Sequence, residues 1–206
     1  MAWIETQLAE KSHPDYSSPT TTFTDIWLRQ KDKMSHEDIL LGVAANIGGA
    51  ADTIDATLSV LIYLLARHPE VLARLREELD EIVSKDRLGD DGLISFESSR
   101  DAPYLQAVIK ETMRLFPAVS VQLPRYVPKG GDVLAGYYFR EGLSVGINPW
   151  STRTEVKYWG EDADVFRPER WLGDGEEVKR NEYYHIPVRR SSQMLKYHFL
   201  FSADVP

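Results

Sequence analysis

The sequence has no cysteine among its 206 residues. This absence excludes a disulfide framework, a thiolate metal site and a cysteine nucleophile. An excess of basic charge is also absent, because 24 lysines and arginines face 32 aspartates and glutamates, for a formal net charge of −8. An acidic chain argues against nucleic acid as a partner. Residues 1–11, MAWIETQLAEK, lack the basic start and long apolar core of a signal peptide.

A long uninterrupted apolar run is missing as well. The most apolar span, residues 39–66, carries Asn46, Asp52 and Asp55 near its middle. One central aspartate in a membrane helix costs about 2.5–3.5 kcal/mol on insertion scales. We therefore expect a core helix of a soluble protein and no membrane segment in this chain.

This apolar span belongs to a long helix that is predicted from Ser35 to about Arg67. Ser35 followed three residues later by Asp38 is a variant of the capping box, and Pro69 ends the helix. Some thirty residues give a length of roughly 45 Å. A helix of that length, apolar on several faces, is expected to cross the middle of a larger domain.

The centre of this helix has a turn of small residues, Gly48 to Ala51, followed by Asp52 and Thr53. Two interpretations are open. In one, the small residues allow close helix packing and Thr53 bonds the carbonyl four residues back. In the other, a large group approaches the backbone at Gly49 and Ala50, and a buried alcohol beside a carboxylate serves proton delivery.

The next helix is predicted over Pro69 to Val83, with Arg74 and Glu78 as an exposed i,i+4 pair. Asp101 is expected to cap the helix that follows.

That helix is predicted over Tyr104 to Pro117, and it carries Glu111 and Arg114 on neighbouring positions about 60° apart. A surface pair at this spacing contributes only a few tenths of a kcal/mol. Glu111 lies on one flank of the apolar stripe of this helix and Arg114 lies just beyond it, which favours a pair that is at least half buried. The aromatic-rich run of residues 158–172 is expected to bring Arg170 towards Glu111, because a carboxylate held by two guanidinium groups tolerates burial.

Between these two segments the pattern changes to strands. Alternation predicts one strand over residues 119–123, and a hairpin of residues 137–139 with residues 143–147 around the turn at 140–142. The fold class predicted is therefore mainly α with a small β-sheet (α+β).

The order Lys-Glu-Thr-Met-Arg-Leu-Phe-Pro at residues 110–117, a β-hairpin, and Phe-Arg-Pro-Glu-Arg-Trp at residues 166–171 resembles the cytochrome P-450 superfamily of haem-thiolate monooxygenases. The sequence of residues 160–172, GEDADVFRPERWL, is similar to that of family members from filamentous fungi. The resemblance implies a scaffold triad that lies under the haem. Its members are Glu111, Arg114 and Arg170.

The resemblance also implies functional residues outside the triad. Asp52 and Thr53 would relay protons to dioxygen at the haem, and Gly49 and Ala50 would make room for it. Here Ala50 replaces a usual glycine and Ile54 a usual second threonine or serine, so the match is partial. Arg125 would meet a haem propionate.

The family implies further partners: a small organic substrate, dioxygen and an electron-donating reductase. Eukaryotic members usually sit at the endoplasmic-reticulum membrane through an anchor that we do not find here. Members are more than twice as long as this chain, so we expect a fragment that lacks the early helices.

The resemblance covers about residues 33–179, but one element that the family has beyond Trp171 is missing. The family requires a Phe-x-x-Gly-x-x-x-Cys-x-Gly loop whose cysteine thiolate is the axial ligand of the iron. Residues 176–206 contain neither glycine nor cysteine. A frame shift or an unspliced intron in the gene would produce such a change.

Three segments are thus expected: a linker with a short helix over residues 1–34, a partial cytochrome P-450 domain over residues 35–175, and an unrelated tail over residues 176–206. We expect a monooxygenase fragment that is itself inactive and does not bind haem. One alternative is a non-catalytic helical interaction protein that kept the scaffold and lost the haem site. Another is a four-helix binding module in which Asp52 and Glu111 are ordinary buried polar groups.

Overall fold

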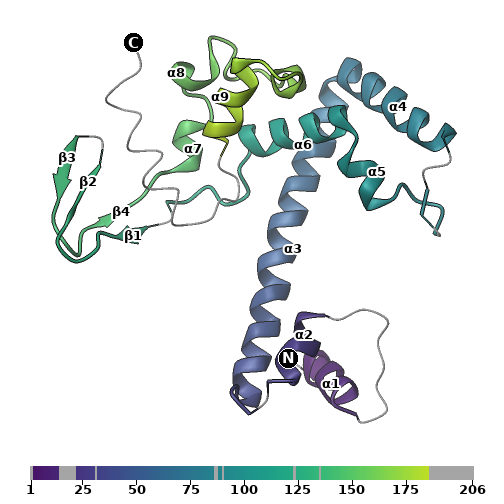
Figure 1. Cartoon of the computed structure of the whole chain (residues 1–206). Helices are drawn as coiled ribbons and strands as arrows, with labels where there is room; N and C mark the ends of the chain where they lie inside the picture. Colours follow the sequence, from purple (N-terminus) through teal and green to yellow (C-terminus); the bar gives the residue numbers. More distant parts are fainter. Residues whose placement is uncertain are drawn as a thin grey trace. The chain divides into compact units, whose positions relative to one another are not determined.

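A computed structural model of the chain describes residues 2–13, 22–30, 32–85, 88–89, 91–122, 124–134 and 136–185 (Figure 1). The chain divides into two compact units, Met1–Asp55 and Ala56–Pro206. Both are built mainly from helices, and the strands form two small two-stranded sheets. The predicted class, mainly α with a small β content, is therefore confirmed.

The first unit holds α1 (Ala2–Lys11), α2 (Phe23–Leu28) and the start of α3 (His36–Arg67). A capping box between Thr22 and Asp25 begins α2. Lys11 joins α1 to this box, with Nζ 2.9 Å from Asp25 Oδ1 and 3.0 Å from Thr22 Oγ1. The Thr22 hydrogen bonds, aided by Lys11, lower the pKa of Asp25 to about 2.

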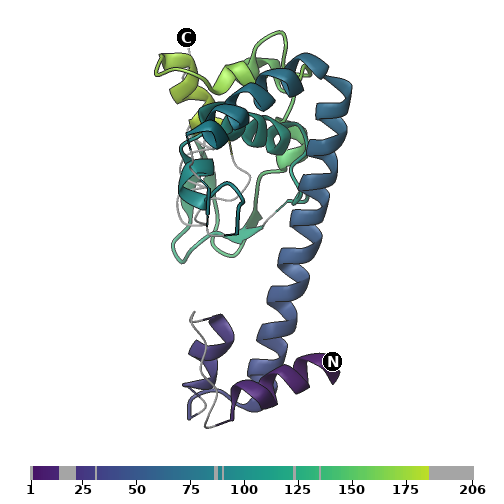
Figure 2. The ribbon, with the colours of Figure 1, turned by 90° about the vertical axis from the view of Figure 1, so that its right-hand side faces the viewer.

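Helix α3 begins where the sequence predicted. The Ser35 amide donates to Asp38 Oδ2 at 2.9 Å, and the Asp38 amide donates to Ser35 Oγ at 3.1 Å. These reciprocal bonds satisfy amide groups that the first helical turn leaves unpaired. The helix then runs without a break to Arg67, and Pro69 follows (Figure 2).

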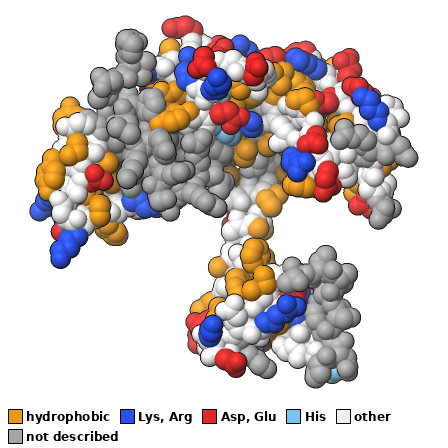
Figure 3. All heavy atoms as spheres, viewed as in Figure 1, with side chains coloured by type: hydrophobic (Ala, Val, Ile, Leu, Met, Phe, Trp, Pro, Cys, Tyr) orange, Lys and Arg blue, Asp and Glu red, His pale blue; other side chains and the backbone are white. Residues whose placement is uncertain are grey.

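Helix α3, predicted as a core helix of a larger domain, is mostly exposed in this chain. Apolar side chains of this helix reach the surface (Figure 3), with exposed fractions between 45% and 66% for Leu41, Ile47, Ile54, Leu58, Ile62 and Tyr63. Composition fixes which residues are apolar, but burial depends on what packs against them. By length and composition alone, α3 is also long and apolar enough to cross a membrane. The absence of a membrane segment therefore stays a prediction.

The second unit is organised around α6 (Pro103–Leu115), which lies between α4 (Pro69–Ser84) and α9 (Glu176–Tyr184) in Figure 1 and belongs to two hydrophobic clusters. One cluster joins α6 to α4 through Val71, Leu75, Tyr104, Val108 and Phe166. The other joins it to α8 (Val156–Trp159), the 3-10 helix η1 (Pro168–Trp171) and α9 through Ala107, Trp159, Ala163, Trp171 and Tyr184. Helix α6 is therefore the core element of this unit.

The start of α6 differs from the sequence prediction. Asp101 was expected to cap it, but Ala102 occupies that position and Asp101 lies 3.2 Å from Arg100. The cap comes instead from α4, where Glu78 accepts from the amides of Tyr104 and Leu105 at 2.8 Å each. A carboxylate is well suited to the positive end of a helix dipole. A tertiary contact has replaced the local one.

The exposed Arg74–Glu78 ion pair that the spacing predicted is not formed, because Glu78 accepts from the amides of α6 instead. Arg74 Nη1 lies 2.8 Å from Glu169 Oε1 of η1, and its guanidinium covers the Tyr104 ring at 4.3 Å. Glu169 Oε1 also accepts from the Tyr104 hydroxyl at 3.0 Å. Burial and this carboxylate raise the pKa of Tyr104 to about 12.

We expect Glu78→Ala to lower the free energy of unfolding by about 1–2 kcal/mol, the loss that removal of a helix cap usually brings. Urea titration followed by circular dichroism measures this difference. Glu77→Ala removes an exposed carboxylate from the adjacent position and should change stability by less than about 0.5 kcal/mol. Equal effects of the two variants would show that Glu78 contributes only its charge.

The strands pair differently from the prediction. β1 (Arg125–Tyr126) pairs antiparallel with β4 (Ser144–Val145), and β2 (Asp132–Leu134) pairs antiparallel with β3 (Tyr137–Phe139). The predicted hairpin joined β3 to β4, which lie in different sheets. A connection of only two residues, with Gly136 at a φ of 79°, favours the β2–β3 hairpin.

The strand predicted over residues 119–123 is also wrong as far as it is described, because residues 119–122 form no strand, and Leu123 lies outside the described residues. Short helices α5 (Phe96–Arg100) and α7 (Pro149–Thr152) complete the unit.

Candidate functional site

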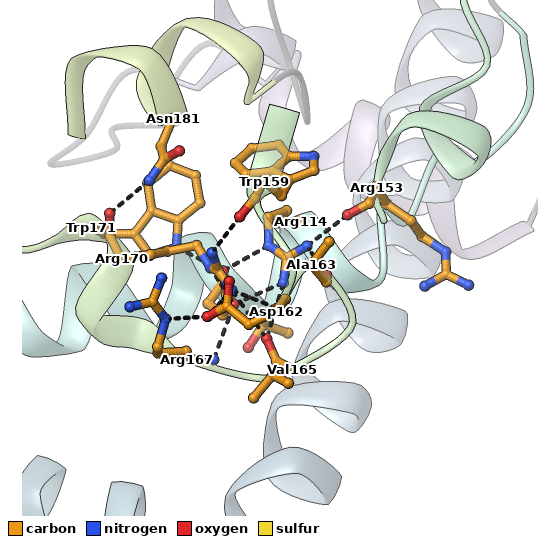
Figure 4. Close-up of polar contacts among 12 residues, drawn as sticks. Arg114, Arg153, Trp159, Asp162, Ala163, Val165, Arg167, Arg170, Trp171 and Asn181 are labelled. Atoms are coloured by element: carbon orange, nitrogen blue, oxygen red, sulfur yellow. Dashed lines mark hydrogen bonds and ion pairs between the residues drawn. The ribbon is translucent and has the colours of Figure 1, made fainter. Parts of the chain in front are cut away.

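The predicted triad is assembled in the second unit (Figure 4). Glu111 and Arg114 lie on α6 and Arg170 lies on η1. Their exposed fractions are 0%, 3% and 2%. The sequence placed Glu111 at the flank of the apolar stripe, but it lies within the buried face of α6. That face is formed by Tyr104, Ala107, Val108, Glu111 and Thr112.

Five donors converge on the Glu111 carboxylate. Oε2 accepts from Arg114 Nε at 2.8 Å and from Trp171 Nε1 at 2.9 Å. Oε1 accepts from Arg114 Nη2 at 2.9 Å, from Arg170 Nε at 2.9 Å and from the Arg167 amide at 3.0 Å. A carboxylate offers about four lone-pair directions, so Glu111 is saturated. Its burial is therefore compensated by hydrogen bonds and charge.

The two guanidinium groups use their remaining donors on backbone carbonyls. Arg114 Nη1 donates to the carbonyl oxygens of Arg153 and Ala163, at 2.6 Å each. Arg170 Nη1 donates to the Trp159 carbonyl at 3.2 Å, and Nη2 to the Asp162 carbonyl at 3.0 Å. The triad thus fastens the loops between α7 and η1 to α6 (Figure 4).

The charge state of Glu111 follows from these contacts. Burial by itself raises the pKa, but the Arg114 hydrogen bond and charge, the Arg170 charge and the Arg167 amide outweigh it and lower the pKa. The carboxylate is ionised at neutral pH. Because the folded pKa lies below the unfolded one, its stabilisation is complete above the ordinary carboxylate pKa and is lost as the pH falls through the lowered value.

Sequence reasoning missed two groups that complete the cluster. Trp171 lies in the recognised run, but nothing indicated that its Nε1 contacts Glu111. Asn181, on α9, is 0% exposed and its Nδ2 donates to the Arg170 carbonyl at 2.9 Å. A single asparagine in a charged helix gives no sequence signal of burial.

Helix α9 begins at Glu176, where the unrelated tail was expected to begin. Besides the Asn181 bond, the Tyr184 ring stacks on Tyr158 with a centroid distance of 4.4 Å. Lys110 of α6 forms an ion pair with Glu182. The described part of this segment, up to His185, is therefore packed into the second unit. The remaining residues, 186–206, lie outside the described part of the chain.

The predicted proton-relay residues lie on α3 in the first unit. Thr53 Oγ1 donates to the Gly49 carbonyl at 2.9 Å. This is the bond to the carbonyl four residues back that the helix-packing interpretation predicted. Asp52, Gly49 and Ala50 are exposed. A Cβ added to Gly49 would meet nothing within 4 Å, so this turn is open to a large neighbour.

Arg125 lies in β1 and is partly exposed. Its Nη1 donates to the adjacent Pro124 carbonyl at 2.8 Å. Its expected propionate contact remains a prediction.

The fold and the cluster together define a mainly helical scaffold in which a loop arginine closes a Glu-x-x-Arg pair. A model of the cytochrome P450 family matches residues 4–187. The chain therefore belongs to the cytochrome P450 family. The match extends beyond both limits, residues 35 and 175, that the sequence suggested for the family domain.

Individual relatives agree with this assignment. A pisatin demethylase from Fusarium vanettenii is 44% identical over 151 residues, which are 73% of this chain and 28% of that protein. The cytochrome P450 monooxygenase cicH from Emericella nidulans is 36% identical over 179 residues, 85% of this chain and 35% of that protein. A zebra fish cytochrome P450 structure aligns with a TM-score of 0.66 and 26% identity, over 90% of this chain and 47% of that one.

The chain thus spans only about a third of the length of these fungal relatives, 28% of one and 35% of the other. The family implies haem, and the residues present do not complete its site. The axial ligand is a cysteine thiolate, and the sequence has no cysteine. Among the residues that the structure describes, no three His, Asp or Glu side chains gather to hold a metal ion.

Proposed function

We propose that this chain is part of a haem-dependent monooxygenase that inserts oxygen from dioxygen into a small organic substrate, with electrons from a reductase. The observation that carries the proposal is the buried Glu111 carboxylate, held by Arg114 and Arg170 in a chain that belongs to the cytochrome P450 family. In this reading the triad is a scaffold that holds the loops after α7 in place. It does not touch the substrate.

Other residues have proposed roles of their own. Asp52 and Thr53 pass protons to the site of oxygen chemistry, Gly49 and Ala50 leave room there, and Arg125 binds a haem propionate. The open turn at Gly49 supports this reading, because a Cβ placed there would meet nothing within 4 Å. When bound, the haem supplies the oxygen activation.

The chain by itself is proposed to be inactive, because it supplies no thiolate to the iron. The competing function is a non-catalytic helical interaction protein that retained the scaffold. The missing cysteine and the exposed apolar side chains of α3 favour it.

The carbon monoxide spectrum of reduced protein tests the proposal. Purified chain mixed with haem is expected to show no red-shifted Soret band of the thiolate type. A full-length gene product in which the family's cysteine loop follows should show that band. A full-length product without the band would favour the interaction protein, and the band in the present chain would contradict its proposed inactivity.

In that full-length enzyme, Thr53→Ala should leave substrate binding intact and lower the share of reductant recovered as product by about tenfold or more, because positioned proton transfer contributes 10²–10⁴-fold. Product and peroxide are measured per reductant consumed. Thr57→Ala changes a threonine one turn further along α3 and should keep the wild-type ratio. An unchanged ratio for Thr53→Ala would argue against the relay.

A further inference from the structure

A pocket of about 270 Å³ lies in the first unit, among α1, α2 and the first part of α3 (Figure 1). Most of its wall is apolar, and the apolar residues that form it are Ile4, Leu8, Phe23, Trp27, Val43 and Ile47. Asp52 and Thr53, the proposed proton relay, are not among the residues that line it. The lining residues have no role in the proposed monooxygenase function, so the pocket needs an explanation of its own.

Packing contacts between the three helices shape this pocket. Trp27 of α2 lies against α3 at Gly42, where an added Cβ would be 3.0 Å from the indole ring. The missing side chain of Gly42 thus allows this close approach. Leu8 of α1 is only 2% exposed, so this helix is also packed against its neighbours. The wall is therefore held by contacts of the protein itself, as in the pre-formed pockets that bind small molecules.

The charge in the wall is already balanced. Among the described residues that line the pocket, Lys11 alone is charged. Its Nζ lies 2.9 Å from Asp25 Oδ1 and 3.0 Å from Thr22 Oγ1. Because Asp25 neutralises Lys11, the pocket does not require an anion, and burial of a charged ligand group without a partner is costly. The wall therefore suits an uncharged ligand.

Two apolar side chains of the wall remain open to solvent, since Phe23 is 69% exposed and Ile47 is 45% exposed. The Phe23 ring lies 6.2 Å from the Trp27 ring, with 31° between the planes. These two rings offer a flat ligand an aromatic surface. Covering apolar surface of this kind is the main favourable contribution when a small molecule enters an apolar pocket. The wall therefore favours an apolar ligand that contains rings.

We propose that this pocket binds an uncharged, apolar molecule about the size of two fused six-membered rings. An apolar protein cavity of about 150 Å³ accommodates benzene, and this pocket is nearly twice as large. A single ring leaves part of the wall uncovered, and a charged molecule finds no partner in it. The site goes beyond the proposed monooxygenase function, because its ligand needs neither haem nor the relay residues.

The test is a titration of the full chain with 2-naphthol at neutral pH, followed by calorimetry and ligand-observed NMR. Saturable binding is expected. Phenol has the same hydroxyl group but one ring fewer, and it should bind at least about tenfold more weakly because it buries less apolar surface. The anion 2-naphthoate keeps both rings and adds a charge, and it should also lose about tenfold or more, since its carboxylate has no partner in the wall.

Matched variants locate the site. Ile47→Glu places a carboxylate in the wall and should weaken 2-naphthol binding by about tenfold or more. Ile62→Glu makes the same change at a position of α3 that is 66% exposed and does not line the pocket, and it should leave the affinity unchanged. Val43→Trp fills the pocket and should abolish binding, which decides the matter if Ile47→Glu fails to fold. Melting curves of each variant establish folding.

The proposal is overturned by no saturable 2-naphthol binding, by phenol or 2-naphthoate binding as tightly as 2-naphthol, or by equal affinities of the wild type and a folded pocket variant. A loss for Ile62→Glu as large as that for Ile47→Glu would overturn it as well, because 2-naphthol would then bind the exposed surface of α3 and not the pocket.

Discussion

Replacing Glu111 by alanine is expected to lower the free energy of unfolding by about 3–5 kcal/mol, the loss seen when one partner of a buried ion pair is removed. The variant leaves two guanidinium groups, both almost fully buried, without their carboxylate. It also leaves Trp171 Nε1 and the Arg167 amide without the acceptor that they share, because both donate to the same carboxylate. No other acid of α6 replaces it, because Glu111 is the only one in that helix.

Urea unfolding at neutral pH, followed by circular dichroism, measures this loss. Domains commonly have a total stability of about 5–15 kcal/mol, so a marginal chain would be largely unfolded without denaturant. The matched control is Glu81→Ala, which removes an exposed carboxylate paired with Lys85 one turn away on α4. An exposed pair contributes at most about 1 kcal/mol. Equal destabilisation by the two variants would mean that the cluster adds nothing beyond a surface pair.

The features that the sequence predicted correctly are local ones. The Ser35–Asp38 capping box, the long helix that follows and the helix carrying Glu111 and Arg114 depend on residues three or four positions apart. Spacing on a helix fixes which side chains are neighbours, so these contacts can be read without knowing the fold. Arg170 was placed beside Glu111 only through the resemblance and the aromatic run around it.

The features that were missed depend on tertiary contacts. Glu78 was paired with Arg74 by spacing, yet α4 packs against α6 and presents Glu78 to two unpaired amides. The strand partners were assigned by sequence neighbourhood, whereas β1 and β4 pair across an intervening hairpin. Unpaired amides at the start of a helix bond to the best available acceptor, and only the fold decides which acceptor that is.

The C-terminal boundary of the family domain stays a prediction. The absence of glycine and cysteine from residues 176–206, and with them of the cysteine loop, suggested that this domain ends at residue 175. Helix α9 instead covers η1, and the family match reaches residue 187. Burial of Asn181 and Tyr184 depends on Arg170 and Tyr158, which are at least eleven residues away, so no local pattern reveals it.

Truncation at two points tests the boundary, and the expected difference is large. Removing residues 176–206 should lower the free energy of unfolding by about 3 kcal/mol or more. The loss has two sources: the Arg170 carbonyl loses its Asn181 donor, worth about 1–3 kcal/mol, and Trp171, now 5% exposed, loses apolar contact worth about 1.5–3 kcal/mol. The Lys110–Glu182 ion pair is lost as well.

Removing only residues 188–206 keeps all of these contacts and the whole of the family match. This shorter truncation should therefore melt within a few degrees of the full chain, because a change of about 1 kcal/mol shifts the melting temperature of a domain this size by about 2–4 °C. Thermal melts of the three proteins side by side give the answer. If the truncation after residue 175 melts like the other two, α9 does not stabilise the triad, and the boundary belongs where the sequence first placed it.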